Sequence, residues 1–254
     1  MRRARPAALI AACVLAACAD RPPPRTPLDV SAASSLREPL LELERRYEQA
    51  HPEVDVRLNL AASGTLRRQV EQGAPVDVSV SAASEPVDQL IRARLLDGRS
   101  RRVVARNTLV IIVPATGTAE VHRIDDLARP EVRRVALGAP ASVPAGAYAR
   151  AALGAAGVAD AIAGRTVFGQ DVRQVLAYVA SGNADAGIVY RTDAAVSDRV
   201  RIAAAVHPSL HPPIIYQVAV AAHASQPDLA RGFVAVLLGP EGRAALHRHG
   251  YLTE

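Results

Sequence analysis

Three short segments of the chain share a pattern that suits the binding of an anion. Ala-Ala-Ser occurs at residues 32–34, 61–63 and 82–84, each time after a strand-like stretch and before a helix-like one. A helix N-terminus offers unpaired N–H groups and the positive end of the helix dipole. A serine there can simply cap the helix, which is the simpler explanation for any one of them. Two or three such serines at one sheet edge resemble an anion site.

The hydroxyl of Ser35 has two competing roles. Ser35 and Glu38 have the Ser-x-x-Glu spacing of a capping box, whereas an anion at the helix N-terminus would need the same hydroxyl as a donor. Pro39 follows at once, and it would remove the first intrahelical N–H bond if Ser35 were the N-cap. The sequence therefore predicts a distorted first turn.

Strand and helix patterns alternate along the chain, and this alternation positions the serines. It favours an α/β fold with parallel sheets flanked by helices. In open α/β sheets, ligands lie outside the carboxyl ends of the strands. The predicted strands are 28–33, 54–61, 76–81, 108–113, 135–137, 166–168, 186–190 and 214–221. The predicted helices are 36–50, 66–71, 87–94, 145–153, 172–181, 229–238 and 242–249.

The composition excludes several chemistries. The 254 residues include no Lys, so neither a Walker A loop nor a pyridoxal phosphate Schiff base can form. Aromatic residues make up only 3% of the chain and Trp is absent, which disfavours a carbohydrate ligand and predicts a core of Ala, Val, Leu and Ile. Histidine pairs at 207/211 and 247/249 lack acidic or Cys residues to complete a zinc set, and they indicate solvated surface.

The net charge of +5 does not indicate nucleic-acid binding. Arg2, Arg3 and Arg5 lie in a predicted leader, and removing them from the 30 basic residues leaves 27 against 25 acidic ones, a difference of +2. The sequence also has no basic stripe interleaved with aromatic residues.

The N-terminus resembles a bacterial lipoprotein leader. A basic start precedes an apolar run at 7–17 that is too short to span a bilayer, and Leu15-Ala16-Ala17-Cys18 resembles a lipobox. We therefore expect a signal peptide at 1–17, lipidation of Cys18 and a Pro-rich tether at 18–27. The protein would lie in the periplasm or at the cell surface.

Five motifs, in order, resemble the periplasmic molybdate-binding proteins of ABC transporters, members of the type II periplasmic binding protein superfamily. Each motif alone is weak, but together they cover nearly the whole chain after the leader. They lie at 33–36, at 62–66 with 72–77, at 143–149, at 170–173, and at 187–190 with 192–194. The segments 239–242 and 249–251 are also similar to the family.

The resemblance implies two α/β lobes, each a mixed sheet flanked by helices, with a ligand cleft between them. We place the first lobe at 28–106 plus 201–254 and the second at 107–200. The implied function is capture of molybdate or tungstate for an ABC importer by a monomer that docks on a membrane permease. No enzyme activity, cofactor or nucleic-acid partner is expected.

Carried over position by position, the resemblance implies five ligand-binding residues. Ser35 and Ser63 would donate hydroxyl groups from the first lobe, Ala145 and Val172 would donate backbone N–H groups from the second, and Tyr190 would donate its phenol. Asp171, beside Val172, would cap its helix with its side chain turned away. The molybdate oxyanion would bind through these residues alone, without any direct cation ligand.

A donor set of this kind suits a fully deprotonated dianion. Molybdate has no proton to give, so a carboxylate in the site would repel it. Each hydrogen bond to a charged oxygen contributes roughly 1.5–3 kcal/mol. Sulfate, phosphate and, less readily, a small organic anion remain alternatives, because the architecture would be unchanged. Cavity size would select between molybdate and sulfate, since Mo–O bonds are longer than S–O bonds.

Two other classes fit the sequence less well. An acyl-transfer enzyme lacks its Gly-x-Ser-x-Gly elbow, and no histidine base is evident for Ser35 or Ser63. A transcription regulator with this fold would need an N-terminal helix-turn-helix, where the chain has a lipoprotein leader instead.

Overall fold

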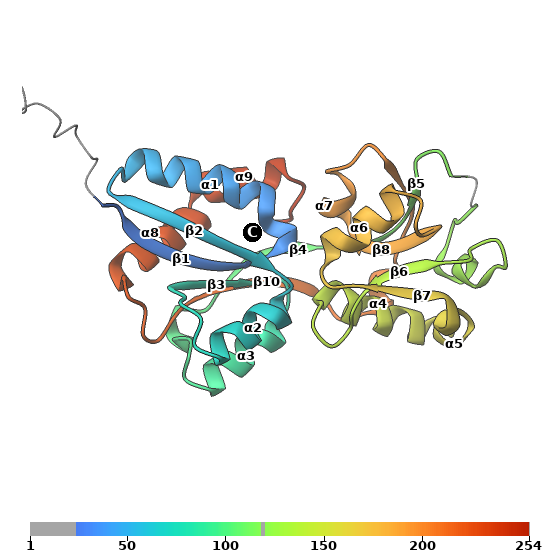
Figure 1. The fold of residues 1–254 in the computed structure, drawn as a ribbon, viewed down its shortest axis with the longest axis horizontal. Helices are drawn as coiled ribbons and strands as arrows, with labels where there is room; N and C mark the ends of the chain where they lie inside the picture. The colour runs from blue at the N-terminus through green and yellow to red at the C-terminus, as the bar shows by residue number, and fades with distance from the viewer. Residues whose placement is uncertain (1–23, 118–119, 254) are drawn as a thin grey trace, which may run out of the picture.

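The computed structural model describes residues 24–117 and 120–253. The predicted signal peptide and Cys18 lie outside the described residues. The chain forms two lobes side by side, each built on a five-stranded sheet with helices on its faces (Figure 1). The predicted fold class, a two-lobed α/β protein with mixed sheets, is thereby confirmed.

The sheet of the first lobe has the strand order β2-β1-β3-β10-β4. Strand β1 runs parallel to β2 and β3, whereas β10 runs antiparallel to both of its neighbours. The strands are β1 (Thr26–Ala33), β2 (Val54–Ala61), β3 (Val78–Ser81), β4 (Arg102–Asn107) and β10 (Ile214–Val220).

The sheet of the second lobe has the order β7-β6-β8-β5-β9. Strand β6 runs parallel to β7 and β8, and β5 runs antiparallel to β8 and β9. The strands are β5 (Leu109–Pro114), β6 (Val135–Gly138), β7 (Thr166–Gly169), β8 (Ala186–Tyr190) and β9 (Val200–Ala205). Both sheets thus combine three parallel strands with antiparallel strands that lead to and from the other lobe.

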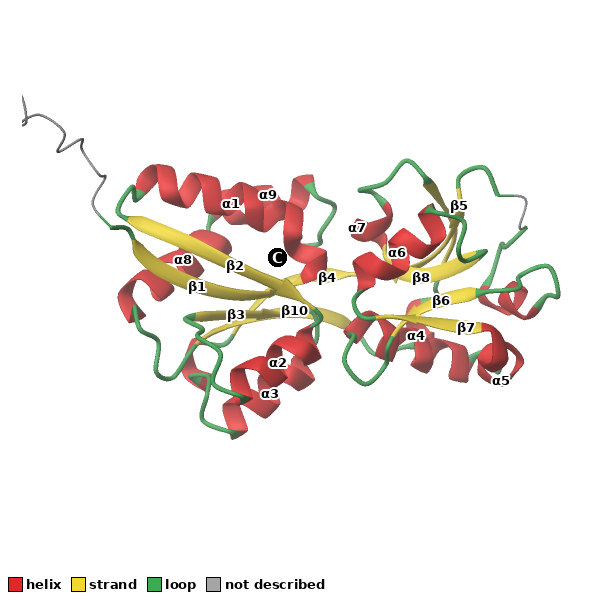
Figure 2. Ribbon diagram, in the orientation of Figure 1, coloured by secondary structure: helices red, strands yellow, loops and turns green. Residues whose placement is uncertain are grey.

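Helices cover both sheets (Figure 2). In the first lobe α1 (Arg37–Ala50), α8 (Pro227–Leu238) and α9 (Pro240–Arg248) pack together, and α2 (Ser63–Glu71) packs against α3 (Ser84–Arg92). The second lobe carries α4 (Pro144–Ala155), α5 (Ala159–Ile162), α6 (Val172–Ala180) and α7 (Arg191–Ala194). The predicted apolar face of α1 is buried, and it consists of Leu36, Leu40, Leu43 and Tyr47.

The chain crosses between the lobes twice, and the second crossing differs from the prediction. β4 leads through Thr108 into β5, whereas β9 leads through a short 3-10 turn, Pro208–Leu210, into β10. Because β9 pairs with β5 of the second sheet, the return crossing lies after Ala205 and not at 200/201. The predicted tether is also too long, because Thr26 and Pro27 already pair with β2.

Strands β4 and β9 were missed because exposed residues and arginine or alanine interrupt their apolar pattern. Both are edge strands, but so are β2 and β7, which were predicted, so edge position alone does not explain the difference. Val103 and Ile202 are about 40% exposed on these strands. Their sequences therefore show neither of the two strand patterns, the alternating one and the fully apolar one.

The first turn before α1 is distorted, as predicted. Ser34–Leu36 forms a 3-10 turn, and the α-helix starts only at Arg37. The predicted capping box is wrong, because no side chain caps this helix end. The Ser35 hydroxyl instead meets the Tyr216 hydroxyl at 2.9 Å, and Glu38 is paired across the cleft with Arg173.

Two glycines on α4 provide a matched test of packing between α4 and β6. A Cβ at Gly146 would lie 2.0 Å from the carbonyl oxygen of Gly138, whereas a Cβ at Gly154 would meet nothing within 4 Å. We expect Gly146→Ala to lower the free energy of unfolding by about 1–3 kcal/mol through overpacking. Gly154→Ala should leave it unchanged or raise it by up to about 1 kcal/mol. Urea unfolding measures both, and equal effects would contradict this account of the α4–β6 contact.

Candidate anion-binding cleft

All five predicted site residues line one small cavity between the lobes. Ser35 and Ser63 approach it from the first lobe, and Ala145, Val172 and Tyr190 from the second. The same cavity is also lined by Ala33, Ser34, Ala61, Ala62, Ala82, Val143 and Pro144. None of the described residues that line it is charged. The structure thus brings together residues that are separated by up to 155 positions in the chain.

The topology explains this convergence. Ser35 and Ser63 follow β1 and β2, and Ala145, Val172 and Tyr190 follow or end β6, β7 and β8. These are the parallel strands of the two sheets, and their carboxyl ends meet at the cleft. The third Ala-Ala-Ser segment contributes Ala82 to the lining, whereas Ser84 does not line this cavity.

The second lobe presents backbone N–H groups. Ala145 is the second residue of α4, and Val172 is the first residue of α6. A backbone N–H in the first turn has no intrahelical acceptor, and the helix dipole adds positive potential there. Asp171 caps α6 as predicted, because its Oδ1 accepts the Gln174 N–H at 2.9 Å. The Asp171 carboxylate is thereby held by the helix end.

Each of the two serine hydroxyls has one hydrogen-bond partner. The Ala82 N–H donates to Ser63 Oγ at 3.0 Å, whereas Ser35 Oγ and the Tyr216 hydroxyl lie 2.9 Å apart and either can be the donor. Both serines are almost fully buried. Neither hydroxyl takes the role of a helix cap. Ser63 can therefore donate its proton into the cavity, and Ser35 can do so when Tyr216 is the donor of their hydrogen bond.

Tyr190 places an unpaired hydroxyl at the cavity. The side chain is 1% exposed, and its hydroxyl has no hydrogen-bond partner among the described residues. Burial raises the pKa of this phenol well above its usual value, and nearby tyrosines and Asp193 add to the shift. The hydroxyl therefore keeps its proton. A buried donor without an acceptor costs free energy, so this residue fits a ligand that accepts hydrogen bonds.

The size of the cavity limits what it can hold. Its volume is about 10 Å³, close to the minimum that a single water molecule needs. An organic ligand such as a sugar phosphate does not fit between the lobes as they stand. A compact ion requires only a small separation of the lobes.

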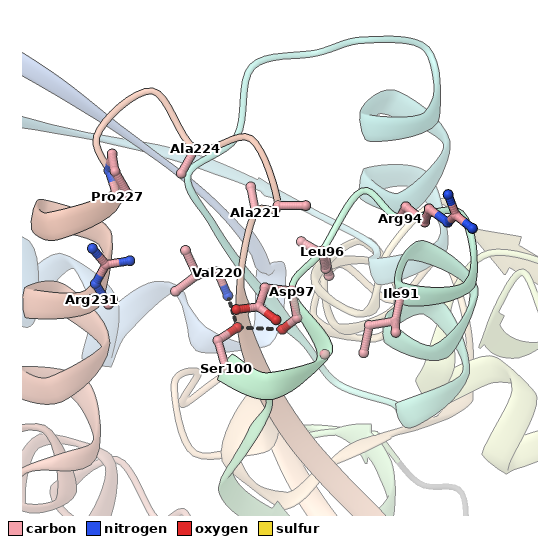
Figure 3. Close-up of a pocket in the computed structure, with 12 residues that line it drawn as sticks. Ile91, Arg94, Leu96, Asp97, Ser100, Val220, Ala221, Ala224, Pro227 and Arg231 are labelled. Carbon is pink, nitrogen blue, oxygen red and sulfur yellow. Dashed lines mark hydrogen bonds between the residues drawn. The ribbon is translucent and has the colours of Figure 1, made fainter.

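A larger pocket lies elsewhere on the first lobe, but it lacks this chemistry. It has a volume of about 510 Å³ and lies between the end of α3, the end of β10 and the start of α8 (Figure 3). Its one hydroxyl, that of Ser100, donates to the Asp97 carbonyl and accepts the Val220 N–H, as Figure 3 shows. Arg231 pairs with Asp228 at 2.6 Å. Its serine and Arg231 are thus engaged by neighbouring groups of the fold.

An arginine bridges the two lobes beside the cavity. Arg173 on α6 donates to Glu38 of α1, and its guanidinium also donates to the Ser35 carbonyl at 3.1 Å. Its Nε lies 2.8 Å from Oδ1 of the fully buried Asp193, although the N–H does not point along a hydrogen bond. Glu38 pairs with this cation and, together with the Asp193 carboxyl and the Ser35 carbonyl, holds it away from the cavity. A second bridge is the Gly64 N–H, which donates to the Ser142 carbonyl at 2.9 Å.

Several residues that support the site were not identified from the sequence. Tyr216 contacts Ser35 across a separation of 181 residues, and Arg173 and Glu38, each close in sequence to a predicted site residue, pair across 135 residues. The expectation of solvated histidines is partly wrong, because His211 stacks edge-on against Tyr148 at 6.0 Å and has a buried Nε2.

Two negative findings apply to the part of the chain that the structure describes. No cluster of three or more His, Cys, Asp or Glu residues that could hold a metal ion is found there. Within the same residues, no helix is both long enough and apolar enough to cross a membrane.

The two lobes, the opposed carboxyl edges of their sheets and the enclosed donor-lined cavity define a bilobal α/β binding protein. Comparison with known proteins agrees with this class. The chain belongs to the bacterial extracellular solute-binding protein family, whose model matches residues 28–252.

Individual relatives share most of their length with this chain. YvgL of Bacillus subtilis, named as an ABC transporter substrate-binding lipoprotein, is 35% identical over 89% of this chain and 86% of its own. The molybdate-binding protein ModA of Haemophilus influenzae is 32% identical over 87% of this chain and 88% of its own. A solved substrate-binding domain from Clostridium difficile, described as part of a molybdenum ABC transporter, has a TM-score of 0.69 at 34% identity, covering 90% of this chain and 99% of that one.

Asp193 should make stability depend on pH. Burial raises the pKa of its carboxyl from 3.8 to about 7 and outweighs the attraction of Arg173. Between these values the folded protein keeps a proton that the unfolded chain releases. The stabilisation from this proton is therefore full below about pH 4 and is lost as the pH rises to about 7.

The variant Asp193→Asn removes this titration. The free energy of unfolding of the wild type, relative to that of the variant, should fall as the pH rises through this range. Denaturant unfolding of both proteins at several pH values measures the difference. A difference that is constant with pH would show that the carboxyl stays ionised when folded.

Proposed function

We propose that this protein captures molybdate outside the cytoplasm and delivers it to an ABC importer. The observation that carries the proposal is the cavity itself, which lies between the two lobes and is lined by neutral residues with hydrogen-bond donors. Tungstate, the same kind of tetrahedral dianion with similar bond lengths, is the second ligand that this site would accept.

The donor set matches the charge of the ligand. Ser35, Ser63 and Tyr190 would donate hydroxyl protons, and Ala145 and Val172 would donate backbone N–H groups. A dianion accepts all five and has no proton that requires an acceptor. No counter-cation is needed, because hydrogen bonds to an ionised acceptor are roughly twice as strong as neutral ones.

The cavity also favours a compact ligand. Because its volume is about 10 Å³, the lobes would separate slightly around a bound oxyanion, and the hinge segments at 107–109 and 206–213 would absorb this movement. Sulfate fits the same donors but is smaller than molybdate. A protonated phosphate would need an acceptor for its proton, and none of the described side chains that line the cavity is a carboxylate.

The relatives support a transport role. The family is that of extracellular solute-binding proteins, and the ModA relatives are named for molybdate binding. This role needs a membrane permease as partner, and it involves no catalytic step and no cofactor. The lipobox-like segment before Cys18 and the lipoprotein name of YvgL support anchoring through a lipidated Cys18, in the periplasm or at the cell surface.

Removing either serine hydroxyl should weaken molybdate binding. Ser35→Ala and Ser63→Ala each delete one donor to a charged oxygen, so we expect the dissociation constant to rise about 10- to 100-fold. Isothermal titration calorimetry measures this change. Ser100→Ala is the matched control, since it removes a hydrogen-bonded serine of the same lobe outside the cleft. Equal affinity in all three variants would refute the site.

Molybdate and tungstate should stabilise the folded protein more than phosphate or sulfate. A ligand that binds only the folded state raises its stability by about 2.7 kcal/mol at a concentration of 100 times the dissociation constant. A thermal-shift series of the unlipidated domain with the four anions tests this ranking. A larger shift with phosphate or sulfate would replace molybdate as the ligand.

A further inference from the structure

A chain of hydrogen bonds leads from the hinge to the cavity. At the end of β4, Asn107 Oδ1 accepts the Thr108 N–H at 2.9 Å. This contact fixes the side-chain amide so that its NH₂ group points the other way. The same NH₂ group donates to Thr192 Oγ1 at 2.9 Å and to the Tyr216 hydroxyl oxygen at 3.4 Å.

The orientation of the Asn107 amide determines how the Tyr216 hydroxyl contacts Ser35. The Tyr216 side chain is fully buried, and its hydroxyl oxygen accepts a hydrogen bond from the Asn107 NH₂ group. The hydroxyl proton of Tyr216 is then free for Ser35 Oγ, which lies 2.9 Å away. Burial raises the pKa of Tyr216 well above its usual value, with further contributions from Tyr251 and Tyr190. The phenol therefore stays protonated at every pH at which the protein works.

These contacts restrict the directions in which the Ser35 hydroxyl proton can point. If one of the serine lone pairs accepts from Tyr216, the serine proton occupies one of the two remaining positions, and Ser35 lines the cavity, so the proton can point into it. Ser63 is held in the same way by the Ala82 N–H. The two serines thus have equivalent environments, one built from a backbone group and the other from a side chain.

We propose that Tyr216 is a positioning residue that holds Ser35 as a hydrogen-bond donor and thereby favours fully deprotonated oxyanions over protonated ones. This inference rests on the proposed function. A serine without such a partner can rotate and accept a proton from hydrogen phosphate. A serine that already accepts from Tyr216 has only one lone pair left for that proton, and its own hydroxyl proton competes for the same direction.

Packing alone is the competing role for Tyr216. Its ring contacts Tyr190 and Tyr251 edge-on, at centroid distances of 5.8 and 5.4 Å. Tyr216→Phe keeps the ring and removes only the hydroxyl, so it separates the two roles. Tyr47→Phe is the matched control, because it removes a buried tyrosine hydroxyl that donates to the Leu229 carbonyl at 3.2 Å, away from the cleft.

The first measurement is calorimetric affinity for molybdate and for phosphate, the latter by displacement of molybdate. Tyr216→Phe should weaken molybdate binding about 3- to 10-fold, the value of one net hydrogen bond. Its phosphate affinity should stay the same or rise, so that the selectivity ratio falls. Tyr47→Phe should change neither. An equal loss for both anions, or phosphate binding to neither protein, would overturn the inference.

A double-mutant cycle provides the second measurement. If Tyr216 acts through Ser35, then Tyr216→Phe should have no further effect on molybdate affinity in a Ser35→Ala background. Additive losses would contradict this coupling. Should Tyr216→Phe not fold, the cycle is run with Asn107→Ala, which removes the donor that directs the Tyr216 hydroxyl.

These experiments distinguish a failure of the proposed function from a failure of the role of Tyr216. A wild-type protein that binds no molybdate refutes the function itself. A wild type that binds molybdate, with a Tyr216→Phe variant of unchanged selectivity, refutes only the role of Tyr216.

Discussion

A dry cavity that holds a dianion must offer donors and nothing else. Removing a doubly charged ion from water is costly, and in a low-dielectric site every misdirected dipole or nearby carboxylate adds to that cost. The protein meets this constraint with hydroxyl and N–H groups at the ends of strands. The small side chains Ala33, Ala62 and Ala82 around the serines allow these backbone groups to approach closely.

Among the residues that the structure describes, the charged side chains near the cleft are positioned so that none of them lines the cavity. Arg173 lies next to Val172 in sequence, yet its guanidinium is engaged by Glu38, Asp193 and the Ser35 carbonyl. These contacts join α6 of the second lobe to the start of α1 in the first. The cation therefore contributes to closure of the cleft, and the cavity lining stays neutral. Fixing this side chain also fixes the backbone around Ser35 and Val172, two of the predicted donors.

Much of the fold could be predicted from the sequence, and the reasons for success and failure are physical. The core strands and α1 were predicted because the spacing of their apolar residues indicates which face is buried. Strands β4 and β9 were missed because exposed apolar residues such as Val103 and Ile202 break that periodicity. The five cleft residues were predicted from motifs resembling a family, and the structure brings them together, whereas their roles as ligands remain proposals. Asn107, Tyr216 and Arg173 were not predicted, since contacts between distant segments leave no local pattern.

The residues that support the site lie beside the hinge between the lobes. Asn107 lies at the end of β4, where the chain leaves the first lobe, and its amide contacts both Tyr216 of the first sheet and Thr192 of the second lobe. A change in the angle between the lobes must alter at least one of these contacts. The contact with Thr192 is the one that depends on closure, because Asn107, Tyr216 and Ser35 all belong to the first lobe. The Ser35 hydroxyl is therefore oriented by its own lobe before a ligand is enclosed, and closure adds the donors of the second lobe.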